Sequence, residues 1–171
     1  MLLPYSKIVG SPIIDLKTQS KLGEVSEIVI KKSDISLHGL ILRGSSILSR
    51  KTNVVAASDI VEIIKGAVVV SDIDSVVDFD EAIRLKEAFL KGFHGIGQKV
   101  VTKNGKTIGK VFDYLVQSDT NLIVKFYVKN LLSEKIIGRN SVISFEKNKI
   151  VIKDDFEEIR IAAAVVESSL V

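Results

Sequence analysis

Short apolar runs separated by turn residues fill most of the chain and predict β-strands. The runs are rich in Val and Ile and are too short for typical helices. They are Leu37–Leu42, Val54–Ala57 and Ala67–Val70 in the first half, and Leu122–Val128, Lys135–Gly138 and Lys149–Lys153 in the second. About five or six strands per half predict a small closed barrel, because closure removes exposed strand edges.

Two segments change to helical spacing. The first places five apolar residues on one side of a helix: Phe79, Ala82, Ile83, Phe89 and Leu90. Asp78 or Asp80 is available as its N-cap and Gly92 as its end. The second segment carries a narrow apolar seam at alternating spacings of three and four: Phe156, Ile159, Ala163, Val166 and Leu170. This seam predicts docking on the chain's own strands or at an interface with another subunit.

The two halves of the chain align with each other. Residues 21–34 match residues 107–120, and the match pairs Gly23 with Gly109 and Glu27 with Asp113. We therefore expect a duplication, divided into a first domain 1–74, a linking helix 75–91, a second domain 92–154 and a helical tail 155–171. Because units of roughly 70 residues are only marginally stable alone, the copies should pack on each other or on the helices.

Glycines punctuate the strands at informative places. Asn104-Gly105 lies between two apolar runs and predicts a hairpin with a type I′ turn. Gly23 and Gly109 fall inside strand patterns, where glycine usually marks a bulge or a barrel corner. The expected fold is mostly β, with two tandem small antiparallel β-barrels, each followed by a short helix.

Composition supports the β assignment and narrows the chemistry. The 45 Val and Ile residues outnumber the 23 Leu and Ala residues about two to one. The absence of cysteine excludes disulfides and thiol chemistry. The chain has no signal-peptide pattern and no apolar run long enough to span a membrane, so a cytoplasmic protein is expected.

The net charge of +3 conceals an uneven distribution. Residues 92–153 carry eleven basic and four acidic side chains, a net +7, whereas residues 72–90 and 154–171 are each −4. The basic residues form a candidate polyanion-binding set: Lys99, Lys103, Lys106, Lys110, Lys125, Lys129 and Arg139. Six aromatic residues of the same domain are candidates for base stacking: Phe93, Phe112, Tyr114, Phe126, Tyr127 and Phe145. The alternative is that the lysines are solvated strand residues and the aromatics belong to the core.

The chain shows no catalytic or cofactor-binding pattern. His38 and His94 lack an acid, a second histidine or a nucleophile at motif spacing. The acidic residues of 72–80 lack the glycine and terminal glutamate of a calcium loop and are better explained as helix-start residues. We therefore expect no enzyme activity, no metal and no cofactor.

The repeated unit resembles the PRC-barrel family. The matching residues are Val9, Gly10, Ile13, Leu22, Gly23, Val25 and Glu27 in the first copy, and Ile96, Gly97, Val100, Gly105, Ile108, Gly109, Val111 and Asp113 in the second. Similar barrels occur in the H subunit of photosynthetic reaction centres and in a maturation factor of the small ribosomal subunit. The resemblance implies a small antiparallel barrel that binds other macromolecules and performs no chemistry.

These observations lead to ranked expectations for function. The first is a non-enzymatic adaptor or scaffold that binds a protein partner, or a second copy of itself, through the apolar seam. The alternative is an RNA- or ribosome-associated assembly factor that uses the basic second domain. A small-ligand-binding protein is a weaker third hypothesis, because barrels of this size are filled by side chains. A contiguous exposed lysine face would favour polyanion binding, and coverage of the lysines by the tail would favour the adaptor.

Overall fold

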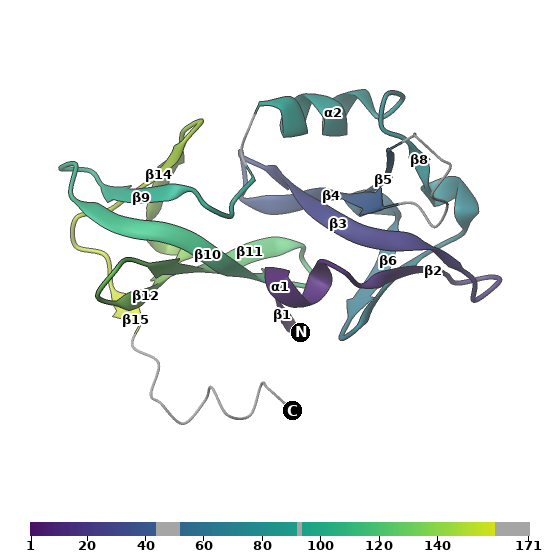
Figure 1. The fold of residues 1–171 in the computed structure, drawn as a ribbon, viewed down its shortest axis with the longest axis horizontal. Helices are drawn as coiled ribbons and strands as arrows, with labels where there is room; N and C mark the ends of the chain where they lie inside the picture. The colour runs from purple at the N-terminus through teal and green to yellow at the C-terminus, as the bar shows by residue number, and fades with distance from the viewer. Residues whose placement is uncertain (44–51, 92–93, 160–171) are drawn as a thin grey trace.

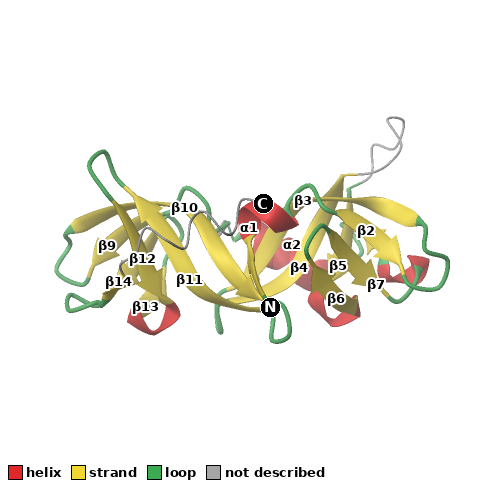
Figure 2. Ribbon diagram, turned by 90° about the horizontal axis from the view of Figure 1, so that it is seen from below, coloured by secondary structure: helices red, strands yellow, loops and turns green. Residues whose placement is uncertain are grey.

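The computed structural model describes residues 1–43, 52–91 and 94–159, and it is mostly β (Figure 1). Fifteen strands in these residues are joined by pairing into one sheet. Figure 2 shows the strands gathered into two curved groups that lie side by side. The mostly β prediction is therefore confirmed.

The two groups have the same internal order, as a duplication requires. The first group runs β6-β7-β2-β3-β4-β5-β8 and the second runs β13-β14-β9-β10-β11-β12-β15. In the first group the strands are β2 (Pro12–Asp15), β3 (Lys21–Lys31), β4 (Ser36–Arg43), β5 (Asn53–Ala56), β6 (Ile60–Ile64), β7 (Ala67–Val70) and β8 (Val77–Asp78). In the second they are β9 (Lys99–Thr102), β10 (Thr107–Gln117), β11 (Leu122–Lys129), β12 (Glu134–Gly138), β13 (Val142–Phe145), β14 (Lys149–Ile152) and β15 (Glu158–Ile159). A 3-10 turn stands at the matching place in each copy, at Ala57–Asp59 and at Arg139–Ser141.

The expected closed antiparallel barrels differ from this arrangement in two ways. Each group contains one parallel pair, β2 with β7 and β9 with β14. The paired strands are far apart in the sequence, because four of the described strands of the same group lie between them along the chain: β3 to β6 in the first group and β10 to β13 in the second. In the described residues no ladder joins β5 back to β6 or β12 back to β13, so neither group is closed by strand pairing.

The glycines inside the strands mark bulges, as predicted. The register shifts by one residue beside Gly23 in the β2–β3 ladder and beside Gly109 in the β9–β10 ladder. The prediction of a type I′ turn at Asn104-Gly105 is wrong. Gly105 has a φ of +87°, but Asn104 is not among the residues with positive φ. Gly105 N donates to Thr102 O and Thr102 N donates to Lys106 O, which makes a three-residue loop that needs only one left-handed residue.

A shared core joins the two groups. Buried residues from both copies, including Ile28 and Ile30 of β3 and Tyr114 and Phe126 of the second group, belong to one contiguous cluster. The start of β4 also pairs with the start of β11, where Leu37 N donates to Asn121 O and Ile123 N donates to Ile35 O. The expectation that the copies pack on each other is borne out by these contacts.

Each copy is also covered by the segment that precedes the other copy. The N-terminal strand β1 (Leu2–Pro4) pairs with β10, and α1 (Tyr5–Ile8) contacts the same strand. The helix α2 (Ile83–Leu90), which precedes the second copy, packs on β3 of the first copy. Figure 1 shows β1 and α1 at the junction of the two groups and α2 over the strands of the first group, so the exchanged segments tie the groups together.

The predicted details of the first helix need correction. Its N-cap is Ala82 and no side chain caps it, because Asp78 instead accepts a hydrogen bond from Asp80 N in the preceding turn. Leu85 is the buried residue of the helix, whereas Ile83 and Leu90 are each 66% exposed. Leu85 packs with Val29 and Ile41 of the sheet, which sets the buried face.

The C-terminal segment begins differently from the predicted helix. Phe156 packs against the shared core, and Glu158–Ile159 forms β15, which pairs with β12. The remaining seam residues, Ala163, Val166 and Leu170, lie outside the described residues. Among the described helices, none has the length and apolar character needed to cross a membrane.

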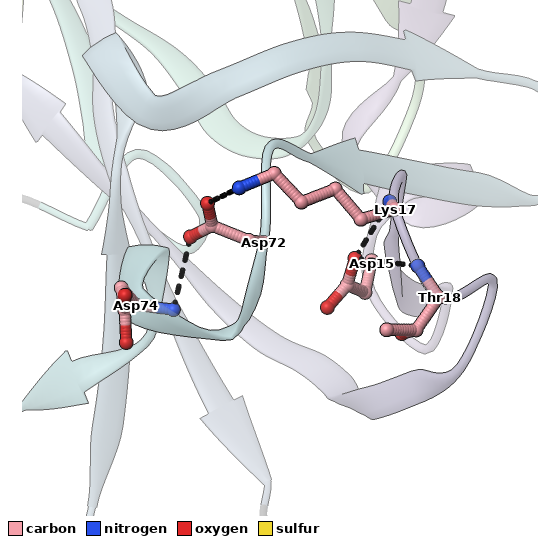
Figure 3. Close-up of polar contacts among 5 residues, drawn as sticks. All are labelled: Asp15, Lys17, Thr18, Asp72 and Asp74. Carbon is pink, nitrogen blue, oxygen red and sulfur yellow. Dashed lines mark hydrogen bonds and ion pairs between the residues drawn. The ribbon is translucent and has the colours of Figure 1, made fainter.

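A polar network fixes the β2–β3 turn to the chain after β7 (Figure 3). Asp15 Oδ1 accepts hydrogen bonds from Lys17 N at 2.7 Å and Thr18 N at 3.0 Å, and Lys17 Nζ lies 2.6 Å from Asp72 Oδ2. Asp72 Oδ1 accepts from Asp74 N at 3.1 Å. Asp72 therefore caps the 3-10 turn Ile73–Ser75, as a helix-start residue does, but none of the acids of residues 72–80 lies at the start of α2, where they were expected.

Candidate functional site

Four lysines of the second copy are brought together by strand register. Lys149 of β14 lies beside Lys99 of β9, Lys99 is paired with Lys110 of β10, and Lys110 is paired with Lys129 of β11. Directly paired residues point to the same face of a sheet. These four side chains, called here the lysine row, therefore form a line across four adjacent strands.

The lysine row carries little compensating charge. Lys149 Nζ lies 3.2 Å from a Glu146 carboxylate oxygen. Among the residues that the structure describes, Lys99, Lys110 and Lys129 make no ion pair within 4.0 Å, although Glu134 is paired with Lys129 across the β11–β12 ladder. Like charges directly opposed on a sheet destabilise it. Repulsion among these lysines therefore destabilises the sheet, and a bound anion would reduce this repulsion.

The first copy shows that the fold does not require this row. At the positions matching Lys149, Lys99, Lys110 and Lys129 it carries Ala67, Pro12, Glu24 and Arg43. Glu24 is paired with Arg43, which is an opposite charge, and it also forms an ion pair with Lys21. The hydrogen bond and the charge of Lys21 lower the pKa of Glu24. The same architecture therefore forms with a balanced row.

Two aromatic rings flank the lysine row. Phe112 occupies the bulge between Val111 and Asp113 of β10, and its ring centre lies 6.0 Å from that of Tyr127. Lys129 Nζ lies 5.1 Å from the centre of the Phe112 ring. Both rings are partly exposed, and burial together with the Asp113 charge raises the pKa of Tyr127. Tyr114 and Phe126 are fully buried in the core, and Phe93 lies outside the described residues.

The other predicted basic residues lie elsewhere. Lys103 and Lys106 are exposed in the β9–β10 turn, beyond the row. Lys125 and Arg139 line a pocket of about 300 Å³ that also contains Glu157. Arg139 Nη1 donates to Ile35 O at 3.0 Å, so this guanidinium holds the two copies together. Of the seven predicted residues, the row therefore unites Lys99, Lys110 and Lys129.

The described part of the acidic tail leaves the row uncovered. Lys135 Nζ pairs with Glu158 Oε2 at 2.8 Å, and Asn104 N donates to Asp154 Oδ1 at 2.9 Å. Neither contact involves a residue of the row. In the described residues the tail thus neutralises a neighbouring lysine and supports the β9–β10 turn.

Two polar pairs join the copies, and motif spacing in the sequence did not predict either of them. His94 Nδ1 lies 2.8 Å from Glu27 Oε1, and Ser6 Oγ donates to Asp113 Oδ2 at 2.6 Å. Glu27 and Asp113 are the matched acids of the repeat, and each binds the segment that precedes the other copy. No hydrogen bond in the described residues joins Ser6 to His94, so these groups form no nucleophile–base–acid relay there. Their arrangement secures the exchanged segments.

His38 lies in a different environment. It lines a pocket of about 440 Å³ together with Arg84 and Lys31, and burial, with the charge of Lys31, lowers its pKa. In the described residues no group of three or more His, Asp or Glu side chains is placed to hold a metal ion.

Comparison with protein-family models and with curated proteins gives no match to this chain.

Proposed function

We propose that this chain is a non-enzymatic adaptor built from two PRC-barrel-like halves, and that its second half docks onto a polyanionic partner through the lysine row. The observation that carries the proposal is the register of Lys99, Lys110, Lys129 and Lys149 across four strands. Four directly adjacent positive charges disfavour the free protein and favour a bound anion. The balanced row of the first copy argues against a purely structural origin.

The structure of the C-terminal segment gives less support to a protein partner than its apolar sequence pattern did. Phe156 packs against the core of its own chain, and Ile159 lies in a strand that pairs with β12. Phe156 is therefore occupied within its own chain, and the segment that begins the predicted helical seam is a strand at residues 158–159. Electrostatic docking by the row is therefore the better supported mode of binding.

RNA is a second candidate for the partner. Phe112 and Tyr127 lie beside the row with partly exposed rings, where unpaired bases can stack while lysines contact phosphates. This candidate corresponds to an RNA- or ribosome-associated factor.

The test compares two triple variants in which neutral glutamine replaces lysine, one in the lysine row and one at three lysines outside it. We expect the triple variant Lys99→Gln/Lys110→Gln/Lys129→Gln to bind a structured RNA or polyglutamate at least about tenfold more weakly, because each lost contact removes a counterion-release contribution. The control variant Lys7→Gln/Lys65→Gln/Lys91→Gln makes the same change of net charge at exposed positions outside the row.

Fluorescence anisotropy at several salt concentrations measures both effects. Wild-type affinity should fall steeply between about 50 and 200 mM salt, and the row variant should show a shallower dependence. Equal affinities of the row variant and the wild type for both probes would show that the row is not the docking surface.

A further inference from the structure

The turn between β11 and β12 exposes two leucines completely. Leu131 is 103% exposed and Leu132 is 95% exposed, more than any other large apolar residue in the described chain. A single exposed leucine is ordinary on a protein surface, but two adjacent ones at the tip of a hairpin present a concentrated apolar surface to solvent.

The structure holds this tip in a defined conformation. Asn130 Oδ1 accepts hydrogen bonds from Leu132 N at 2.8 Å and Ser133 N at 2.9 Å, and Asn130 N donates to Ser133 O at 3.0 Å. Asn130 Nδ2 also donates to Ile108 O of β10 at 3.0 Å. The leucines are thus presented by a turn that is tied to the sheet.

Basic residues surround the same end of the sheet. Lys129 directly precedes the turn and belongs to the lysine row, and the bond from Asn130 to Ile108 places the turn beside the start of β10. The β9–β10 turn, which carries Lys103 and Lys106, projects from that same end, and Figure 1 shows this end of β9 and β10 far from the first copy. Glu134 offsets part of this charge.

We infer that this end of the second copy binds the surface of an anionic lipid bilayer, with Leu131 and Leu132 inserted and the lysines among the headgroups. The inference rests on the proposed function, because the lysine row supplies the electrostatic attraction, and it names the polyanion as a layer of lipid headgroups. An apolar tip buried about 5–10 Å deep with lysines behind it satisfies the requirements of a peripheral membrane site. A phosphate backbone alone leaves the leucines unused.

The first measurement uses the full chain and its lack of tryptophan. The chain contains no Trp, so Leu131→Trp introduces a single reporter at the tip. We expect its emission to shift to shorter wavelength with vesicles of phosphatidylcholine and phosphatidylglycerol, and to stay unchanged with phosphatidylcholine alone. Ile83→Trp places the matched reporter at an exposed position of α2, the helix that packs on the first copy, and its emission should not shift.

The second measurement compares co-sedimentation of variants with the same vesicles. Leu131→Ser/Leu132→Ser should weaken binding to anionic vesicles at least about tenfold, since two leucines lose their burial. Each row lysine changed to Gln should weaken it about fivefold. The control Ile83→Ser/Leu90→Ser removes two exposed apolar residues from α2 and should bind like the wild type. Thermal unfolding of every variant confirms that each is folded.

The outcomes separate the inference from the proposed function. Wild-type protein that fails to bind anionic vesicles, or a leucine variant that binds them as well as the wild type, overturns the lipid inference. If the row variant then still loses affinity for RNA or polyglutamate, the proposed function stands without it. Leucine-dependent binding to neutral and anionic vesicles alike would also overturn the inference, because it removes the role of the lysines.

Discussion

Gly109 and Lys110 are neighbours in β10 and affect the stability of the sheet in opposite directions. A Cβ atom at Gly109 would lie 2.3 Å from Lys129 O, so the close approach of β10 and β11 needs a glycine there. Lys110 lies between two other lysines, an arrangement that weakens the sheet. The packing of β10 on β11 explains Gly109, whereas Lys110 is explained by the anion binding that we propose for the lysine row.

Replacing Gly109 with alanine should destabilise the protein markedly. The obstructing atoms belong to the backbone of Lys129, so the two strands have to move apart. We expect Gly109→Ala to lower the free energy of unfolding by about 1–3 kcal/mol, as overpacking does elsewhere. Urea denaturation measures this change. The matched control is Gly23→Ala, where the nearest atom lies 3.2 Å away, and its loss should be smaller.

Replacing Lys110 with glutamate should separate stability from binding. The change gives the second copy the acidic residue that Glu24 supplies in the first, between Lys99 and Lys129. We expect Lys110→Glu to raise the free energy of unfolding by about 0.2–1 kcal/mol for each new opposite-charge pair. The same variant should bind polyanions more weakly. A variant that loses stability and keeps its affinity would contradict our account of the row.

At the scale of elements, the local features were predictable and the distant pairings were not. Val and Ile runs located the strands, and Gly23 and Gly109 located the bulges, because these signals act over a few residues. The parallel β2–β7 and β9–β14 pairs depend on strands far apart in the chain. Of the predicted apolar face near α2, Phe79, Ala82 and Phe89 pack against the sheet as expected. Ile83 and Leu90 are exposed, because β3 and β4 bury Leu85 instead.

The candidate site was predictable only in part, for the same reason. Charge counting identified the basic second copy, but only strand register shows that Lys99, Lys110 and Lys129 share a row while Arg139 binds the first copy. The contact of His94 with Glu27 joins residues 67 positions apart, which no motif spacing reveals. The exposure of Leu131 was also not predictable, because an apolar residue in a sequence suggests burial and only the structure of the turn shows that its side chain faces solvent.

The polar network of the β2–β3 turn predicts acid sensitivity. Hydrogen bonds from the backbone of Thr18 and Lys17 lower the pKa of Asp15, and the hydrogen bond from Lys17 lowers the pKa of Asp72. A carboxyl whose pKa is lower in the folded state contributes stability above its unfolded pKa, about 3.9 for aspartate, and loses it as the pH falls through the folded value. The urea midpoint should therefore decline as the pH drops below about 4.

Asp15→Asn tests this assignment because asparagine keeps the acceptor oxygen and does not titrate. The variant should show a shallower decline of the urea midpoint below about pH 4 than the wild type. Asp59→Asn, at an exposed aspartate of the 3-10 turn before β6, is the control and should follow the wild-type curve. Parallel curves for Asp15→Asn and the wild type would show that Asp15 is not the acid-sensitive group.

At the scale of the whole molecule, the exchanged segments make two repeats into one cooperative unit. The strand β1 and the helix α1 lie on the second copy, α2 lies on the first, and one core runs through both. Neither repeat can unfold without uncovering the other, so unfolding should be a single transition.

Two single-tryptophan variants test this, Ile83→Trp on α2 and Ile143→Trp on β13, both at exposed positions. Their urea midpoints should coincide, because each reporter follows the same event. Midpoints that separate would mean that the repeats unfold independently, and the contacts of Arg139 with Ile35 and of Ser6 with Asp113 would then contribute little to their coupling.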